Sequence, residues 1–249
     1  MQSPEPVAPE KTSLPQSSSA AANLLHSFVS PRALTLCVLA GVVLSALVAW
    51  LGVGVHLAHL RQLRFLISGA GTDTHQLSQI EVALRIARGV QAGVFALTAL
   101  AFLAWLYRLR ANVRALGVRK LEFARHWSVL GFLVPGLNVV RPYQVMAEVW
   151  RASDPSVLDP FEWKALDPPR ILTLWWASVV IAAALELTAF GLGHTAGVHA
   201  FKSLVASAVA VAADLATGVS TSLAYFVVTR LAASQIAKHE RLLGDGEDP

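Results

Sequence analysis

The chain has 249 residues, of which 55% are hydrophobic and only 14% are charged, against roughly 25% charged residues in soluble proteins. Its 20 Lys and Arg outnumber its 16 Asp and Glu, but these cations gather at the ends of apolar runs, which indicates membrane orientation and excludes a nucleic-acid partner. The single cysteine excludes an intrachain disulfide and a cysteine-based metal cluster.

Residues 1–30 are rich in Pro, Ser and Ala. A segment of this composition cannot bury enough apolar surface to order itself, so we expect a disordered cytoplasmic tail. A membrane helical domain is expected over residues 31–232, and a polar C-terminal tail over residues 233–249.

Four apolar segments are long enough to cross a bilayer as helices. They are predicted at residues 33–57, 89–107, 171–191 and 201–228. The second belongs to a longer helix that starts near Thr74. In the first, Gly41, Ser45 and Ala49 recur every four residues, which lets another helix approach closely. The fourth carries small residues on one face and is predicted to be the most enclosed helix.

A fifth apolar run, at residues 127–140, is too short to cross a hydrocarbon core of roughly 30 Å, and Pro135 and Gly136 interrupt it. Such a run indicates a re-entrant or half-membrane element that other parts of the protein cover. The polar residues at the break are candidates for a binding or gating role: Asn138, Arg141, Tyr143, Gln144 and Glu148. The structural alternative is that Asn138 caps the second half-helix while Arg141 binds freed carbonyls or headgroups.

The distribution of Lys and Arg predicts which side of the membrane each segment occupies. If residues 127–140 do not cross, 15 of the cations lie on the side of the two termini and 5 lie on the other side. A crossing would remove this bias. We therefore expect four spans in a bacterial inner membrane, both termini in the cytoplasm, and a re-entrant element that enters from the cytoplasm.

A basic cluster follows Trp105 and Tyr107 at the exit of the second span. It consists of Arg108, Arg110, Arg114, Arg119 and Lys120. Aromatic residues followed by cations are typical of a helix end among lipid headgroups. The cluster predicts either a plain topological anchor or a patch that recognises anionic lipids.

Two carboxylates lie within the spans, Glu186 in the third and Asp214 in the fourth. Both share a helix face with small or polar residues, so both are expected to point into the bundle. Such acids are candidates for a proton- or cation-linked role, and satisfied structural acids are the alternative. In adjacent antiparallel spans the two carboxyls come within reach of a shared water or ion, with Arg141 and Lys202 as the nearest expected basic residues.

His56 and His59 lie on one helix face, a spacing that suits a metal or a pH sensor, although scattered interfacial histidines are the plainer interpretation. The chain has no phosphate-binding loop, dinucleotide fingerprint, zinc-protease motif or nucleophile elbow. We therefore expect no enzymatic activity, no cofactor and no metal.

Several short motifs lie before, at and after the break. They are the run from Phe102 to Arg108 with Arg110 and Asn112, Trp127-Ser128, Val134-Pro135, the run from Asn138 to Met146, the run from Glu148 to Ser153, and Leu174-Trp175-Trp176. These motifs resemble an uncharacterised bacterial membrane family, domain of unknown function 4328, over roughly residues 40–230. The chain departs from the family pattern at Phe132-Leu133. At this place the family has tryptophan or a denser aromatic pair before the proline. The resemblance implies the membrane fold and the place of the polar motif, and no activity.

The sequence as a whole predicts an all-α, polytopic membrane helical bundle that acts as a membrane interaction, sensing or scaffold module. The alternative is a small transporter or channel that uses the broken element together with Glu186 and Asp214. The expected partners are the bilayer, anionic lipids, and a protein partner or a second copy of the chain.

Overall fold

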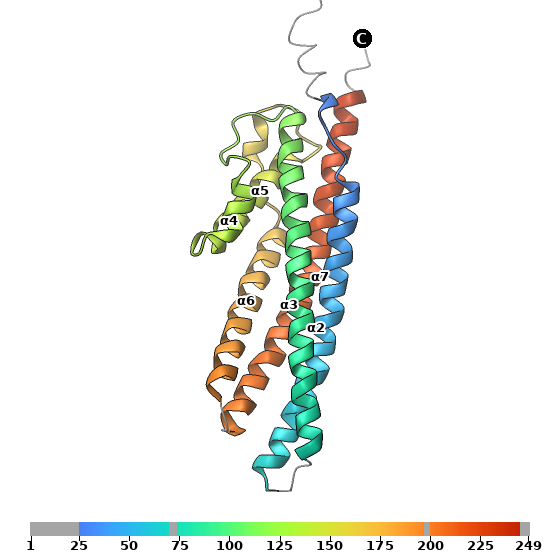
Figure 1. Ribbon diagram of the computed structural model, residues 1–249. Helices are drawn as coiled ribbons and strands as arrows, with labels where there is room; N and C mark the ends of the chain where they lie inside the picture. The colour runs from blue at the N-terminus through green and yellow to red at the C-terminus, as the bar shows by residue number, and fades with distance from the viewer. Residues whose placement is uncertain (1–24, 70–73, 197–199, 245–249) are drawn as a thin grey trace, which may run out of the picture.

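The computed structural model describes residues 25–69, 74–196 and 200–244, so residues 1–24 of the predicted tail lie outside the described residues, as do residues 245–249. The described residues form six α-helices and two 3-10 turns, and no strand (Figure 1). The helices are α2 (Arg32–Ile67), α3 (Thr74–Ala115), α4 (Trp127–Leu133), α5 (Arg141–Ala152), α6 (Arg170–Ala196) and α7 (Ala200–Gly244), and the turns are η1 (Leu137–Val139) and η2 (Glu162–Ala165).

The helices α2, α3, α6 and α7 are long and apolar enough to cross a membrane, which confirms the four predicted spans. Between 11% and 33% of each apolar window is buried within the protein, so most of this apolar surface faces outward and needs lipid to cover it. The window of α7 is the most enclosed, at 33%, as predicted. This helix continues without a break to Gly244, so residues 233–244 form its last turns and not a separate polar tail.

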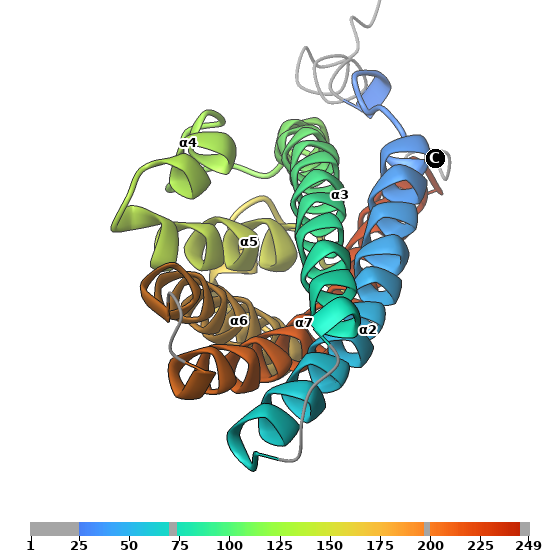
Figure 2. The ribbon, with the colours of Figure 1, turned by 60° about the horizontal axis from the view of Figure 1, so that its bottom comes forward.

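The four long helices form an open arc. The helix α2 packs against both α3 and α7, and α7 packs against α6, so the order around the arc is α3, α2, α7 and α6. The helices α3 and α6 are the two ends of this arc, and they make few contacts with each other (Figure 2).

The arc is closed at one end only. There α5 contacts both α3 and α6, beside the described chain ends (Figure 1). Its side chain Met146 is fully buried in a core with Trp105 of α3, Leu172 of α6 and Val227 of α7. Toward the opposite end α6 diverges from α3, and this divergence positions the candidate site.

The predicted break at Pro135 and Gly136 is present between α4 and η1. Gly136 has a φ of 81°, a left-handed conformation that favours glycine, and α5 follows with Pro142 in its first turn. The α5 N-cap is Val140, with no side-chain hydrogen bond to the helix start, so Asn138 is not the cap. The Asn138 side chain is exposed.

The predicted small-residue stripe of α2 lies against α3. A Cβ atom added to Gly41 would lie 2.6 Å from the Thr98 hydroxyl oxygen, closer than two such atoms approach. The Ser45 hydroxyl lies 3.4 Å from the same oxygen, and Ala49 is fully buried. The stripe therefore sets how closely α2 and α3 pack, as the sequence predicts.

We expect Gly41→Ala to lower stability by about 1–3 kcal/mol, because the new methyl group forces Thr98 and its helix to shift. Gly54→Ala is the matched control on the same helix, since no atom lies within 4 Å of a Cβ at that position. Thermal unfolding of the two detergent-purified variants measures the difference. Equal unfolding midpoints would show that α2 and α3 do not pack at Gly41.

Candidate functional site

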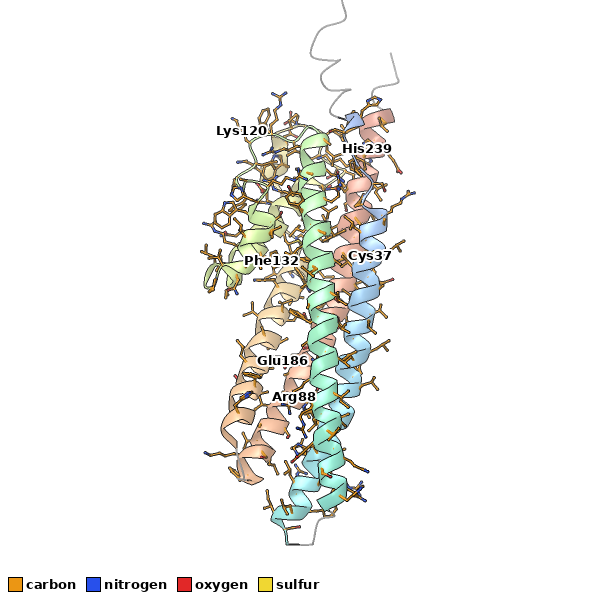
Figure 3. The ribbon with its side chains drawn as sticks, in the orientation of Figure 1. Cys37, Arg88, Lys120, Phe132, Glu186 and His239 are labelled. Atoms are coloured by element: carbon orange, nitrogen blue, oxygen red, sulfur yellow. The ribbon has the colours of Figure 1, made fainter. Side chains whose placement is uncertain are left out.

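A polar cavity of about 320 Å³ lies where α3 and α6 diverge. The four long helices all contribute to its walls, and Glu186 and Arg88 lie at neighbouring heights of the bundle (Figure 3). We define the polar cavity by its charged and polar lining residues: His56, His59, Glu81, Arg85, Arg88, Gln91, Glu186, Ser203, Ser207 and Asp214.

The centre of the polar cavity is a buried pair formed by His56 of α2 and Asp214 of α7. The His56 Nδ1 atom lies 2.9 Å from Asp214 Oδ2 and 3.0 Å from the Gly52 carbonyl oxygen. Both neighbours are acceptors, so Nδ1 carries the proton and donates it. A Cβ on Gly52 would lie 2.7 Å from Asp214 Oδ2, so this glycine makes the room that the carboxylate occupies.

Gln91 of α3 joins the two carboxylates predicted to face inward. Its Nε2 atom donates to Glu186 Oε1 at 3.2 Å and to Asp214 Oδ1 at 3.4 Å. The group that the acids share is therefore a side-chain amide. Gln91 was not among the residues predicted from the sequence. It could have been found as a polar side chain within an apolar span.

The cations near these acids are not the predicted ones. Arg141 lies at the other end of the bundle, and the exposed Lys202 does not line the polar cavity, whereas Arg85 and Arg88 do. Within the described residues, the histidine–aspartate pair is the only ion pair of this cavity, because no guanidinium nitrogen lies within 4.0 Å of a carboxylate there. Asp214 is paired with His56, whereas the exposed Glu186 accepts from the Gln91 amide and has no paired cation among the described residues, which favours uptake of a proton or another cation at Glu186.

The two histidines are not scattered at an interface, so that interpretation is wrong. His56 and His59 are both buried, and His59 Nδ1 lies 2.8 Å from the Ser207 hydroxyl of α7. The signal that marks them is the buried face of α2, because Gly52, His56, His59 and Leu63 recur at helical spacing.

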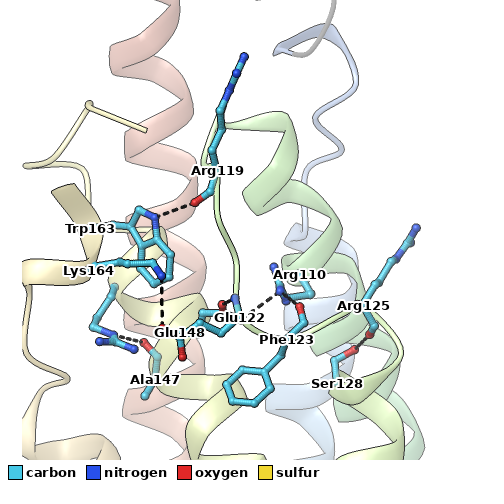
Figure 4. A network of polar contacts seen from close by, with 11 residues as sticks. Arg110, Arg119, Glu122, Phe123, Arg125, Ser128, Ala147, Glu148, Trp163 and Lys164 are labelled. Carbon is cyan, nitrogen blue, oxygen red and sulfur yellow. Dashed lines mark hydrogen bonds and ion pairs between the residues drawn. The ribbon is translucent and has the colours of Figure 1, made fainter. Parts of the chain in front are cut away.

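A second polar cluster lies at the closed end of the arc. The side chains of Arg110 on α3 and Glu148 on α5 are each 1% exposed and form an ion pair at 3.0 Å. Arg110 also donates to the Phe123 carbonyl, and Glu148 accepts from the backbone N–H of Glu122, so the pair fixes the segment before α4 (Figure 4). Burial raises the pKa of the Glu148 carboxyl above its usual range, and the Arg110 guanidinium partly offsets this rise.

Hydrogen bonds extend this cluster into α7. The fully buried Lys238 donates to the Ala152 carbonyl at 3.0 Å, at the C-terminus of α5, where a cation is favourable. The Gln235 amide donates to the Ser153 hydroxyl at 3.2 Å and accepts from Asn112 at 3.0 Å. The last turns of α7 are thereby tied to α3 and α5.

The basic residues predicted to bind lipid headgroups therefore divide into two groups. Arg110 is buried with Glu148, so it does not face headgroups, and the prediction for it is wrong. Arg114, Arg119 and Lys120 are exposed, and Arg108 is half-buried. For these four residues contact with lipid stays a prediction.

The polar residues after the break contact their own surroundings and not the carboxylates. Arg141 donates to Gln144 Oε1 at 3.0 Å, and its guanidinium lies 5.7 Å from the Trp127 ring centre. The Tyr143 hydroxyl lies 3.0 Å from that of Thr173 on α6. The broken element and the two acids therefore do not form one site, contrary to the predicted transporter arrangement.

An arc of four apolar helices with the buried His56, His59 and Asp214 between them is typical of a multi-pass membrane protein. A family model described as "Domain of unknown function (DUF4328)" matches residues 69–233, and the chain belongs to this family. The match includes Gln91, Glu186 and Asp214 but begins after α2, so His56 lies outside it. Neither a search of curated proteins nor a search of solved structures found a match.

Proposed function

We propose that this membrane protein is a proton-sensing module in which the polar cavity takes up protons and changes the spacing of α3 and α6. The observation that carries the proposal is the chain of contacts from His56 through Asp214 and Gln91 to Glu186, which links all four long helices. Imidazole titrates in the physiological range, and the two carboxylates are next to each other in an apolar bundle. We propose a sensing role and no catalytic one.

Besides the His56–Asp214 pair itself, titratable or charged groups line the polar cavity from three helices of the arc. They are His59 on α2, Glu81, Arg85 and Arg88 on α3, and Glu186 on α6, while α7 adds the hydroxyls of Ser203 and Ser207. The carboxylates of Glu186 on α6 and Asp214 on α7 both contact the Gln91 amide, and when both are ionised they repel each other there. Protonation of His56 or of a carboxylate reduces this repulsion, so acidification is expected to bring α6 toward α3.

A distance measurement across the gap tests this proposal. Spin labels at Val90 on α3 and Leu187 on α6, both exposed, are introduced into a Cys37→Ser chain and reconstituted in vesicles. The label distance is expected to shorten between about pH 8 and pH 5, the range over which histidine titrates. Labels at Leu51 and Leu215, on the packed helices α2 and α7, are the control and should not move. An α3–α6 distance independent of pH would contradict the proposal.

Transport is the second candidate function, and the charged and polar lining of the polar cavity favours it. A channel, however, needs a continuous polar path, and the fully buried Trp105, Leu109 and Val227 fill the bundle between the polar cavity and the closed end of the arc. Transport would require these side chains to separate. Sensing requires only a change of spacing at the open end, which is why we favour it.

We further propose that the protein lies in the bacterial cytoplasmic membrane with both termini in the cytoplasm, as the bias of 15 cations against 5 supports. In this orientation the exposed apolar side chains of Leu133, Val139 and Val140 enter the cytoplasmic leaflet. The exposed Arg114, Arg119 and Lys120 lie on the cytoplasmic side, where they meet anionic headgroups.

Cysteine labelling tests this orientation in the Cys37→Ser chain. A single cysteine at Ser156, in the α5–α6 connection, is expected to be labelled only from the cytoplasmic side. One at Ser68, at the end of α2, is expected to be labelled only from the other side. Both positions are exposed. Labelling of both from one side would overturn the orientation.

A further inference from the structure

Apart from the His56–Asp214 pair, the described residues of the polar cavity include charges of both signs that form no ion pair with each other. Two of its three carboxylates, those of Glu186 and Asp214, contact Gln91, and the third belongs to Glu81 on α3. Its guanidinium groups come from Arg85 and Arg88 on the same helix, and within the described residues neither is in an ion pair or a hydrogen bond. Charges left apart around an open space suit a ligand that carries both opposite charges.

The helix α3 sets the spacing of the two charge groups. Arg88 is three residues and Arg85 six residues from Gln91, which places them about 4.5 Å and 9 Å further along the helix axis. Glu186 and Asp214 therefore lie toward the closed end of the arc, and Arg85 and Arg88 lie toward its open end, where Glu81 also lines the polar cavity. A ligand that satisfies both groups is oriented, with its cation inward and its anion outward.

We propose that the polar cavity binds a small zwitterion, with a primary amine at the Glu186 and Asp214 carboxylates and a carboxylate or phosphate group at Arg85 and Arg88. A primary amine has three N–H donors for carboxylate oxygens that otherwise accept from the Gln91 amide and, at Asp214, from His56. Guanidinium groups bind carboxylate and phosphate through paired hydrogen bonds. The ligand assignment rests on the proposed function for its site, because the same carboxylates take up the proton.

The surroundings of the polar cavity limit the size and source of this ligand. A volume of about 320 Å³ is at the small end of ligand pockets and suits a single small molecule. The exposed side chain of Phe190, which lines the polar cavity, gives it an apolar rim that also suits an acyl chain. The same amine and anion chemistry therefore has two sources, a water-soluble amino acid or the ethanolamine phosphate headgroup of a lipid.

A series of ω-amino acids tests the assignment by varying the distance between the charges. The full chain is reconstituted in phosphatidylcholine nanodiscs, whose quaternary ammonium headgroup has no N–H donor. Glycine, β-alanine, 4-aminobutyrate and 6-aminohexanoate are then titrated by calorimetry at constant pH. We expect one chain length to bind best, and butylamine or butyrate, which each lack one charge, to bind at least about tenfold more weakly.

Variants then assign the two ends of the ligand. Glu186→Gln and Arg88→Gln are each expected to weaken binding of the best zwitterion by about tenfold or more, since each removes one charged hydrogen-bond partner. Arg64→Gln is the matched control, because Arg64 is an exposed arginine of α2 outside the polar cavity. Equal binding by all four proteins would overturn the assignment.

The lipid source is tested by replacing phosphatidylcholine with phosphatidylethanolamine. If the lipid headgroup is the ligand, this lipid raises the unfolding midpoint of the wild type, leaves that of Arg88→Gln unchanged, and competes with the soluble zwitterion. Absence of binding by every soluble probe, together with equal unfolding midpoints in the two lipids, would overturn the zwitterion site.

The ligand assignment and the proposed function fail in different ways. The pH-dependent distance between α3 and α6 is measured without ligand, so a wild type that moves with pH but binds no zwitterion overturns the ligand assignment alone. A protein that binds the zwitterion through Glu186 and Arg88 but keeps one α3–α6 distance at every pH overturns the proton-sensing function alone.

Discussion

Glu148→Ala is expected to destabilise the protein by about 3–5 kcal/mol, because it leaves the Arg110 guanidinium buried without a counter-charge. Both side chains are 1% exposed, so water does not replace the lost carboxylate. The backbone N–H of Glu122 loses its acceptor as well, which frees the segment that leads into α4. Unfolding in mild detergent, followed by helical circular dichroism, measures this loss.

Two further variants separate the buried pair from surface charge. Glu122→Ala removes one partner of the exposed Lys164–Glu122 contact, which spans 3.4 Å, and is expected to cost less than about 1 kcal/mol. The double variant Arg110→Met with Glu148→Met removes both buried charges and is expected to recover part of the loss. A single Glu148→Ala variant as stable as Glu122→Ala would show that the ion pair does not hold the closed end of the arc.

Asp214→Asn is expected to abolish the pH-dependent change of the α3–α6 distance while leaving the fold intact. The asparagine oxygen still accepts the hydrogen bond from His56, so the shape of the contact survives. The substitution removes the negative charge at position 214, and it therefore also removes the repulsion from Glu186 that protonation relieves. The measurement is the Val90–Leu187 label distance between about pH 8 and pH 5. A response of wild-type size would remove Asp214 from the mechanism.

A glycine pair tests the same contact without changing any charge. Gly52→Ala places a methyl group where the Asp214 carboxylate lies, and it is expected to displace the carboxylate from His56 and to reduce the pH response. Gly54→Ala, two residues further along α2 and facing open space, should respond like the wild type. Identical responses of the two variants would contradict a role for the His56–Asp214 contact.

Local sequence patterns predicted the parts of the fold that depend on one helix at a time. The four spans follow from long apolar runs, and the turn at Gly136 follows from a proline and a glycine inside a short one. The inward direction of Asp214 follows from the small residues that share its helix face. In each case the physical cause lies within a few helical turns of the residues concerned.

The parts that depend on which helices are neighbours were not predictable in this way. His56 and Asp214 are 158 residues apart, and only the order of the arc shows that α2 packs against α7. In the sequence Arg110 looks like a headgroup anchor, because it belongs to a basic cluster. Its partner Glu148 comes from another helix, so the sequence does not show the ion pair. Lys238 lies in a polar segment that suggests a tail, yet it is fully buried and donates to the Ala152 carbonyl at the end of α5.

Because α5 contacts α6 at the closed end of the arc only, a tilt of α6 about this contact displaces the opposite end of the helix most. A helix of 27 residues is about 40 Å long, so a tilt of only about 5° about the contact with α5 moves its far end by about 3.5 Å. That displacement exceeds the length of a hydrogen bond. In the proposed function, a tilt caused by an electrostatic change beside Glu186 would therefore move the far end of α6 more than it moves Glu186 itself.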